Sequence, residues 1–448
     1  MSETTSSEGT RPETERAGWA SFALMWIGQF VSLVGSRITA FAFGVFVFEQ
    51  TSSASAYTVI LLLAGLPGLL LAPFAGALVD RFDRRMVMLI SDIASAVASL
   101  SMVLVLTLSG GQLSTGYVYV YVGFGALLQA FLWPAYMSST TLLMPKRHLA
   151  RASGLMQLGM ASAAVLAPIP APWLLSSVGV TGIIWIDFVS FVLAALSLLR
   201  VRIPRPTPKV PPAGGGGRTS LTEDIALGWR FIRERPGLMI LLWYFAMINL
   251  VFTMGSALVT PMVLSFASRE TLSMVSATGS AGFLVGSLVA AATGGPRRRV
   301  MTVLSFGFLL GVAFLLAGIK PWPGLIAAAL FLGLFGVPLV NTSSQAVWQV
   351  KVPAELQGRI FAVRRMIAQC TIPIGQLAAG PLADYVFRPL LVEGGPLAGT
   401  VGKVVGVGPG RGIALIYLVL AIFPAAISVW GFFHPRLRTL EEELPDAV

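Results

Sequence analysis

The chain has 448 residues, of which 55% are hydrophobic and only 11% are charged. A soluble globular protein carries about 25% charged residues, so this composition excludes a large soluble domain. The formal net charge of +11 would suit a nucleic-acid partner, but the basic residues form short groups between long apolar runs, which is a pattern of membrane topology.

Apolar runs follow one another from Trp19 almost to the end of the chain, each near the ~20 residues that a helix needs to cross a bilayer. The expected fold class is an all-α membrane protein with twelve transmembrane helices. We expect the spans near 19–48, 55–79, 86–108, 115–144, 153–178, 180–200, 237–265, 271–294, 298–319, 322–350, 357–388 and 411–434.

The distribution of arginine between the spans predicts the orientation of the chain. Arginine groups follow the second, fourth, eighth and tenth spans, and the last group is taken to include Arg359, Arg364 and Arg365. The breaks around Ser52, Gly110 and Gly179 contain no Lys or Arg. Because basic loops stay on the cytoplasmic side, both termini are expected there. The polar segments 1–18 and 435–448 are therefore expected to be cytoplasmic tails, and the first lacks the apolar stretch of a signal peptide.

A change of composition after the sixth span predicts a cytoplasmic linker at 201–236. It is rich in proline and glycine, and then Ser220 and Glu223 form a capping-box pair before a short amphipathic helix, which we expect on the inner membrane surface. The linker divides the spans into two six-helix halves, 19–200 and 237–434.

The loop from Gly76 to Arg85 resembles the cytoplasmic signature of the major facilitator superfamily, Gly-x-Leu-x-Asp-Arg-x-Gly-Arg-Arg, with Asp83 in place of the usual glycine. Other segments resemble the macrolide efflux permeases of that superfamily and, more distantly, enterobactin exporters. These segments are Trp26 to Leu33, Ile186-Asp187, Gly358 to Phe361 and Pro373 to Gly375.

The resemblance implies a secondary active exporter of small organic molecules in a bacterial inner (cytoplasmic) membrane. Macrolide-like drugs, siderophores or natural products would be its substrates, and it would work as a monomer by alternating access with proton antiport. The fifth span keeps prolines but lacks two glycines typical of antiporters in this superfamily. A nutrient or siderophore importer on the same fold therefore stays open, and a transporter-like sensor is a further alternative.

A cytoplasmic gate motif is expected in the signature loop and the third span. The small Gly76 permits close helix approach, and arginines can pair with acids or with the carbonyls that end a helix. For Arg84 and Arg85 a role in topology alone stays open, whereas an acid adds nothing to topology. The expected gate residues are Gly76, Asp80, Arg81, Arg84, Arg85 and Asp92. For Asp92, which lies inside the third span, a structural or gate role is favoured over that of a proton carrier.

Charged residues within the other spans are candidates for substrate or proton coupling. Arg37 lies in the middle of the first span, where an arginine costs at least ~2.5 kcal/mol, so it should face a water-filled cavity or an acid. Asp187 lies inside the sixth span and is either a proton carrier or a structural partner. Glu49 ends the first span as either a functional group or a hydrated helix end.

Uncharged polar residues are expected either to contact substrate or to join helices by hydrogen bonds. They are Gln29 in the first span, Gln129 in the fourth, Asn249 in the seventh and Asn341 in the tenth. No cofactor or metal site is expected, because Cys370 is the only cysteine and the two histidines are far apart. We also find no catalytic grouping and no phosphate-binding loop, so the chain is not expected to be an enzyme.

Overall fold

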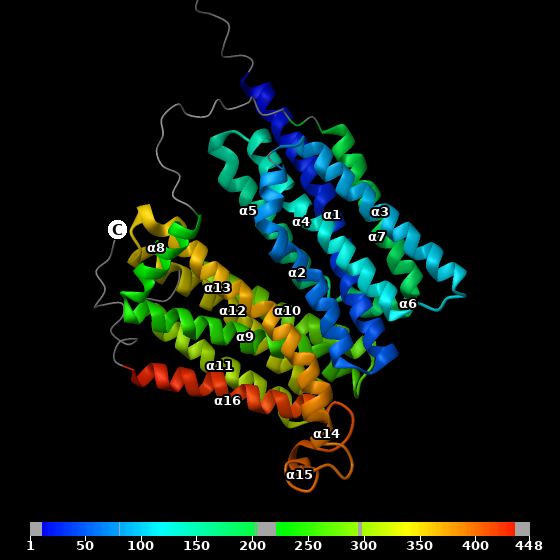
Figure 1. The fold of residues 1–448 in the computed structure, drawn as a ribbon, viewed down its shortest axis with the longest axis vertical. Helices are drawn as coiled ribbons and strands as arrows, with labels where there is room; N and C mark the ends of the chain where they lie inside the picture. Colours follow the sequence, from blue (N-terminus) through cyan, green and yellow to red (C-terminus); the bar gives the residue numbers. More distant parts are fainter. Residues whose placement is uncertain (1–10, 80, 202, 204–220, 294–297, 435–448) are drawn as a thin grey trace, which may run out of the picture. The chain divides into compact units, whose positions relative to one another are not determined.

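The computed structural model describes residues 11–79, 81–201, 203, 221–293 and 298–434. Within these ranges the chain consists of helices and turns and contains no strand, which confirms the all-α fold class (Figure 1). The helices of the first part of the chain are α1 (Arg11–Thr51), α2 (Ala54–Val79), α3 (Arg84–Leu108), α4 (Thr115–Leu143), α5 (Leu149–Leu166), α6 (Pro170–Ser177) and α7 (Gly179–Arg200). They are followed by α8 (Leu221–Arg233), α9 (Pro236–Leu264), α10 (Arg269–Thr293), α11 (Arg299–Ile319), α12 (Pro323–Lys351), α13 (Ala354–Pro381), the π-helix η2 (Leu382–Phe387), α14 (Arg388–Leu390), α15 (Gly402–Val405) and α16 (Arg411–Phe433).

Ten helices in the described part of the chain are long and apolar enough to cross a membrane. The pair α5 and α6 would add an eleventh span, although the two helices are bent by 55° relative to one another. The bend falls at 167–169. Pro168 within this segment and Pro170 directly after it lack the backbone N–H that a continuous helix needs. The expected fifth span is thus a broken one.

Helix α13 is not among these helices, because its sequence is less apolar. Its 28 residues nevertheless exceed the length needed to span a bilayer. Arg359, Arg364 and Arg365 all lie in its first half. The count of twelve spans and the cytoplasmic position of both termini therefore stay predictions.

The chain forms two compact units, and the boundary is not a single point in the sequence. The first unit comprises 1–46 and 63–213, and the second comprises 47–62 and 214–448. The last residues of α1 and the first residues of α2 thus belong with the later helices. Each unit is described separately below.

In the first unit, α3 packs along α7 and against α4 (Figure 1). Small residues bring α1 close to α7: a Cβ at Gly35 would lie 2.5 Å from Ser190 Oγ, and one at Gly28 would collide with Ser197. Glycine at these positions permits the two backbones to approach closely. This approach places the middle of α1 beside the polar residues of α7.

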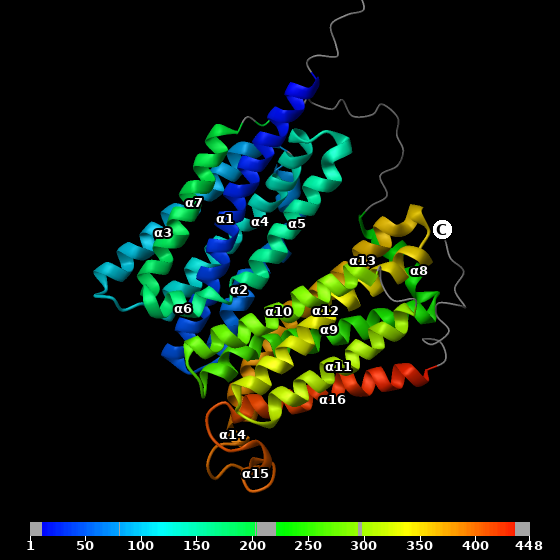
Figure 2. The ribbon, with the colours of Figure 1, turned by 180° about the vertical axis from the view of Figure 1, so that it is seen from behind.

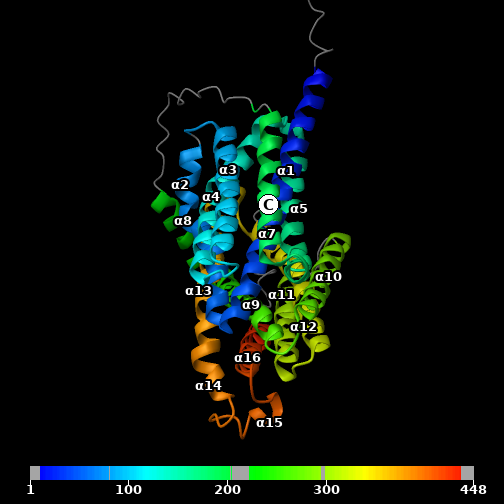
Figure 3. The ribbon, with the colours of Figure 1, turned by 90° about the vertical axis from the view of Figure 1, so that its right-hand side faces the viewer.

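In the second unit, α10 packs along α12 and α11 packs along α16, as Figure 2 shows from behind. Helix α13 continues through η2 into α14, and the segment that carries α15 lies beyond this end of the unit (Figure 3). Pro381 begins this departure from regular α-helix, since it cannot donate a backbone hydrogen bond.

The short helix expected in the linker is present as α8. Its residues Phe231 and Ile232 are buried, and a Cβ at Gly228 would lie 3.1 Å from the carbonyl oxygen of Arg359 in α13. This part of α8 is packed on protein, where we expected its apolar face to lie on the membrane surface. The capping-box residue Ser220 lies outside the described residues.

Candidate functional site

Asp187 is the centre of a hydroxyl network inside the first unit. Its side chain on α7 is 2% exposed. One carboxylate oxygen accepts a 2.7 Å hydrogen bond from Tyr121 Oη of α4, and the other accepts a 3.3 Å bond from Ser36 Oγ of α1. Tyr121 Oη also lies 2.8 Å from Ser99 Oγ of α3. The carboxyl group thus joins α1, α4 and α7 directly, and α3 reaches it through Tyr121.

No basic side chain among the described residues forms an ion pair with Asp187. A carboxyl group surrounded by hydroxyls has partners in both protonation states, because a hydroxyl can donate to the carboxylate or accept from the carboxylic acid. The network can thus accommodate the gain and loss of a proton without breaking an ion pair.

A second buried carboxyl group, Asp92 of α3, contacts another residue singled out in the sequence. Gln29 Nε2 of α1 donates a 2.8 Å hydrogen bond to Asp92 Oδ2, and both side chains are buried. The other oxygen, Oδ1, is also buried and has no hydrogen-bond partner among the described residues. Leaving such an acceptor unpaired is costly for an ionised carboxylate.

Arg37 follows Ser36 on α1 but is exposed. It forms no hydrogen bond or ion pair with any residue that the structure describes. Of the two environments expected from the sequence, an accessible space agrees with this position, whereas an acid partner is not observed there.

Arg85 and Arg81 of the signature loop lie in different environments. Arg85 donates hydrogen bonds from Nε to the carbonyl oxygen of Leu198 at 2.9 Å and from Nη2 to that of Leu199 at 2.7 Å. These carbonyls end α7, where the helix dipole attracts a cation. The bonds join α3 to α7 within the first unit, whereas Arg81 is exposed.

Asp83, which replaces the glycine of the signature, is the N-cap of α3. Its side chain accepts a 3.0 Å hydrogen bond from the backbone N–H of Arg85, which is the ordinary role of aspartate at this position. A Cβ at Gly76 would meet no atom of the described residues of the first unit within 4 Å. Asp80 lies outside the described residues.

Glu49 pairs with Arg269 of α10 in the second unit. Arg269 Nε lies 2.6 Å from Glu49 Oε1, and Arg269 Nη2 contacts Oε2. Each side chain is 31% exposed, so the pair is partly hydrated. Glu49 is therefore not a free helix end.

Next to this pair, Asp384 of η2 binds the turn at 52–55, which we call the Ser52 turn. Its carboxylate accepts hydrogen bonds from Ser53 Oγ at 2.7 Å and from the backbone N–H groups of Ala54 and Ser55 at 3.1 and 2.8 Å. Arg388 donates to the carbonyl oxygen of Ser52 at 3.3 Å. Asp384 thus caps the positive end of α2.

A cavity of about 350 Å³ lies at the Ser52 turn, and all of its lining residues belong to the second unit. Charged groups at its wall are Glu49, Asp384 and Arg388.

A smaller cavity of about 120 Å³ lies between α9, α11 and α12. Asn249 and Asn341, both singled out in the sequence, line it together with aromatic residues that include Phe245, Phe252 and Phe306. Gln129 is not part of this group: it lies half-buried on α4 of the first unit and makes no hydrogen bond with a described residue.

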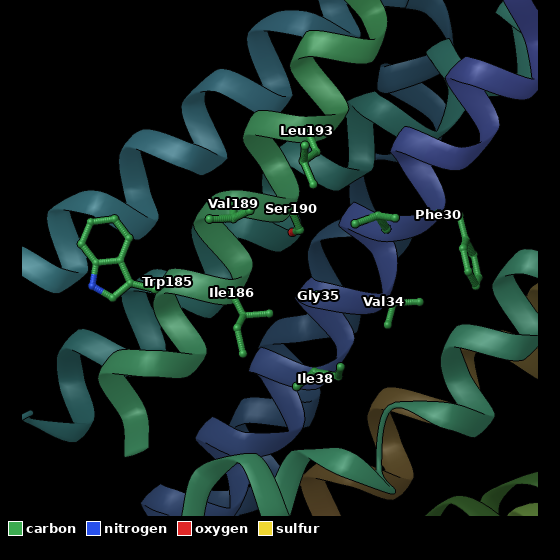
Figure 4. A pocket seen from close by; sticks show the side chains of 10 residues that line it. Phe30, Val34, Gly35, Ile38, Trp185, Ile186, Val189, Ser190 and Leu193 are labelled. Carbon is green, nitrogen blue, oxygen red and sulfur yellow. The ribbon is translucent and has the colours of Figure 1, made fainter. Parts of the chain in front are cut away.

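A groove of about 490 Å³ lies between α1 and α7 in the first unit (Figure 4). Its walls are apolar except for Ser190, and Trp185, Val189 and Leu193 are 42–49% exposed. Exposed apolar side chains on a membrane helix are suited to lipid. The groove has no polar group that would orient a substrate, apart from that one hydroxyl.

Three residues at these sites are not among the site residues expected from the sequence. Tyr121 resembles an ordinary aromatic residue of a span in the sequence, and Asp384 is not among the site residues expected above. Arg364 was counted with the arginines of a cytoplasmic loop, yet it lies ten residues into α13 and reaches α12. An arginine so far inside a helix was the available signal.

Comparison with known proteins gives a consistent result. The family model described as Major Facilitator Superfamily matches residues 25–376. Macrolide efflux protein A of Streptococcus pyogenes is 27% identical over 369 residues, covering 82% of this chain and 90% of that protein. The multidrug efflux pump Tap of Mycolicibacterium fortuitum is 26% identical over 424 residues, covering 91% and 94%.

Among solved structures, a bacterial homolog of the human lysosomal transporter Spinster, in an inward-facing and unoccupied conformation, matches with a TM-score of 0.67. The match covers 98% of this chain and 99% of that one at 13% sequence identity. At this identity the likeness concerns the fold alone.

Proposed function

The chain belongs to the Major Facilitator Superfamily, and we propose that it is a secondary active exporter of small organic molecules that uses proton antiport. The membrane-spanning helices and the efflux-pump relatives agree with transport, and neither the family nor these relatives are enzymes. The likeness to macrolide efflux protein A and to Tap supports macrolide-like drugs, siderophores or natural products as substrates. We place it, as a monomer with twelve spans and cytoplasmic termini, in a bacterial inner membrane.

The observation that carries the proton-coupled part is the environment of Asp187. This carboxyl group is buried and held by Tyr121 and Ser36 without a cationic partner in the described residues. Protonation turns one carboxylate oxygen of Asp187 from a hydrogen-bond acceptor into a donor. When the proton lies on Oδ1, Ser36 of α1 has to accept a hydrogen bond instead of donating one, which links proton binding to the position of α1.

Arg37 connects this rearrangement to substrate. It is the residue after Ser36 and is exposed on α1, so a movement of α1 at Asp187 also moves a charged group on the accessible side of the helix. The proton and the substrate then both change the position of α1. Each shifts the equilibrium between the two conformations of the transporter only if it binds one conformation more tightly than the other. We propose that this shared helix is the coupling element of an alternating-access cycle.

Proton movement in inside-out membrane vesicles tests the proposal. Vesicles energised to hold a proton gradient are challenged with macrolides, other hydrophobic drugs and catechol siderophores while internal pH is followed. An exporter should release protons when its substrate is added, and vesicles without the protein are the control. If no compound in the panel triggers proton release, proton-coupled export is contradicted and the importer becomes the better account.

A further inference from the structure

Arg364 bridges α13 to two other helices inside the second unit. Its Nη1 donates a 3.1 Å hydrogen bond to Gln345 Oε1, and its Nη2 donates a 2.6 Å bond to Ser344 Oγ, both on α12. The guanidinium carbon lies 5.4 Å from the ring centre of Trp348 on α12 and 5.9 Å from that of Phe245 on α9. Both distances are within the range of cation–π attraction.

All of these partners are neutral. No carboxylate among the described residues pairs with Arg364, although its side chain is half-buried. A guanidinium group has five N–H donors, and only two of them are used in the bonds to α12. An arginine inside a membrane helix is expected to face an acid, a water-filled cavity or a ligand. Donors and positive charge therefore remain available at this position.

A polar and aromatic surface adjoins the guanidinium group. Phe245, whose ring faces Arg364, also lines the 120 Å³ cavity together with Asn249, one helical turn further along α9. On α12, Asn341 lines the same cavity and lies one turn before Gln345, the hydrogen-bond partner of Arg364. Residues four apart share a helix face, so one stripe on each helix connects the cavity to the arginine.

We infer that Arg364 binds the anionic group of the transported molecule, so that the preferred substrates are amphiphilic organic anions such as carboxylates. Arginine is suited to this role because its fork matches a carboxylate and makes charge-assisted hydrogen bonds. Gln345 and Ser344 hold the fork in position, while the amides and aromatic rings contact the rest of the molecule. This inference rests on the proposed transport function and specifies its substrate class.

Binding of three fluorescent probes to the purified protein in lipid nanodiscs tests the inference. Dansylglycine carries a carboxylate, dansylglycine methyl ester is neutral, and dansylcadaverine carries an amine, while all share one fluorophore. We expect the parent protein to bind dansylglycine about tenfold or more tightly than the ester, as a charge-assisted hydrogen bond would give. Arg364→Gln should abolish this preference.

Arg365→Gln is the matched control, because Arg365 is the exposed neighbour on the same helix and has no polar partner in the described residues. It should keep the preference for dansylglycine. Arg364→Lys keeps the charge but loses the planar guanidinium fork, so its preference for dansylglycine over the ester should be smaller than that of the parent protein but still present. If Arg364→Gln does not fold, this smaller preference in Arg364→Lys tests the inference in its place.

Equal binding of the three probes by the parent protein would overturn the inference, and so would an unchanged preference in Arg364→Gln. Binding in nanodiscs needs no proton gradient. An anion preference without substrate-triggered proton release in vesicles would therefore contradict the export proposal and leave the inference intact, whereas proton release without anion preference would do the reverse.

Discussion

The two units hold opposite charges on neutral partners. In the first unit, Asp92 and Asp187 are buried carboxyl groups held by an amide and by hydroxyls. In the second unit, Arg364 is held by an amide and a hydroxyl, and buried Arg411 donates to the carbonyl oxygen of Val405 at 3.2 Å.

The acids of the second unit are bound quite differently from those of the first. Glu49 forms an ion pair with Arg269, and Asp384 accepts bonds from the N-terminus of α2. Their partners are a guanidinium group and hydrogen-bond donors, whereas an amide and hydroxyls hold Asp92 and Asp187. Under the proposed function the first unit would carry the exchangeable proton, because its buried acids have no cationic partner among the described residues.

The approach of α1 to α7 holds the hydroxyl network together, so enlarging Gly35 should have the largest effect. The added Cβ of Gly35→Ala would lie 2.5 Å from Ser190 Oγ and 3.4 Å from Asp187 Oδ1. We expect a loss of about 1–3 kcal/mol in stability, measured by thermal unfolding of the purified protein in detergent.

Gly65→Ala is the control, because a Cβ there meets no atom within 4 Å. Combining Gly35→Ala with Ser190→Gly removes the colliding side chain and should restore part of the stability. If Gly35→Ala does not lower the unfolding temperature, close packing of α1 on α7 is not what stabilises the hydroxyl network.

Asp384→Asn should have the next largest effect. The amide keeps one acceptor oxygen but presents an NH₂ group to donors that the carboxylate now binds. We expect a loss of about 1–2 kcal/mol in the same unfolding measurement.

Asp83→Asn serves as the matched control, since Asp83 is an exposed N-cap and asparagine caps a helix about as well. Equal effects of the two substitutions would mean that the fixed charge of Asp384 contributes nothing beyond capping.

Glu49→Gln should have the smallest effect. The pair with Arg269 is partly exposed, and such pairs contribute less than about 1 kcal/mol. The double substitution Glu49→Arg with Arg269→Glu should unfold at nearly the parent temperature, whereas each of these two single changes should lower it. A large loss in Glu49→Gln would instead place this pair among the main stabilising contacts of the second unit.

Much of the helical architecture could be predicted, because long apolar runs and arginine-bearing loops mark membrane helices directly. The expected third span, 86–108, agrees closely with α3 at Arg84–Leu108, and the sixth span, 180–200, with α7 at Gly179–Arg200. Helix periodicity and the prolines of the fifth span do not give the angle of a break. The bend between α5 and α6 therefore had to come from the structure.

Candidate site residues could be selected by chemistry, but their partners could not. A polar residue within an apolar span is conspicuous, and this drew attention to Gln29, Asp92 and Asp187. Whether Asp187 meets Arg37 or Tyr121 depends on helix rotation and packing, which no local pattern specifies. Arg364 was misplaced for a related reason: arginines mark cytoplasmic loops so often that one inside a helix was grouped with them.

The most direct test of proton coupling compares two transport modes in proteoliposomes that contain either the parent protein or Asp187→Asn. The substrate is a compound that triggers proton release in the vesicle panel. We predict that Asp187→Asn loses uptake driven by a pH gradient but keeps exchange of labelled for unlabelled substrate without a gradient, because exchange requires no net proton movement. Uptake that still responds to the pH gradient in Asp187→Asn would contradict the account and move the proton site elsewhere.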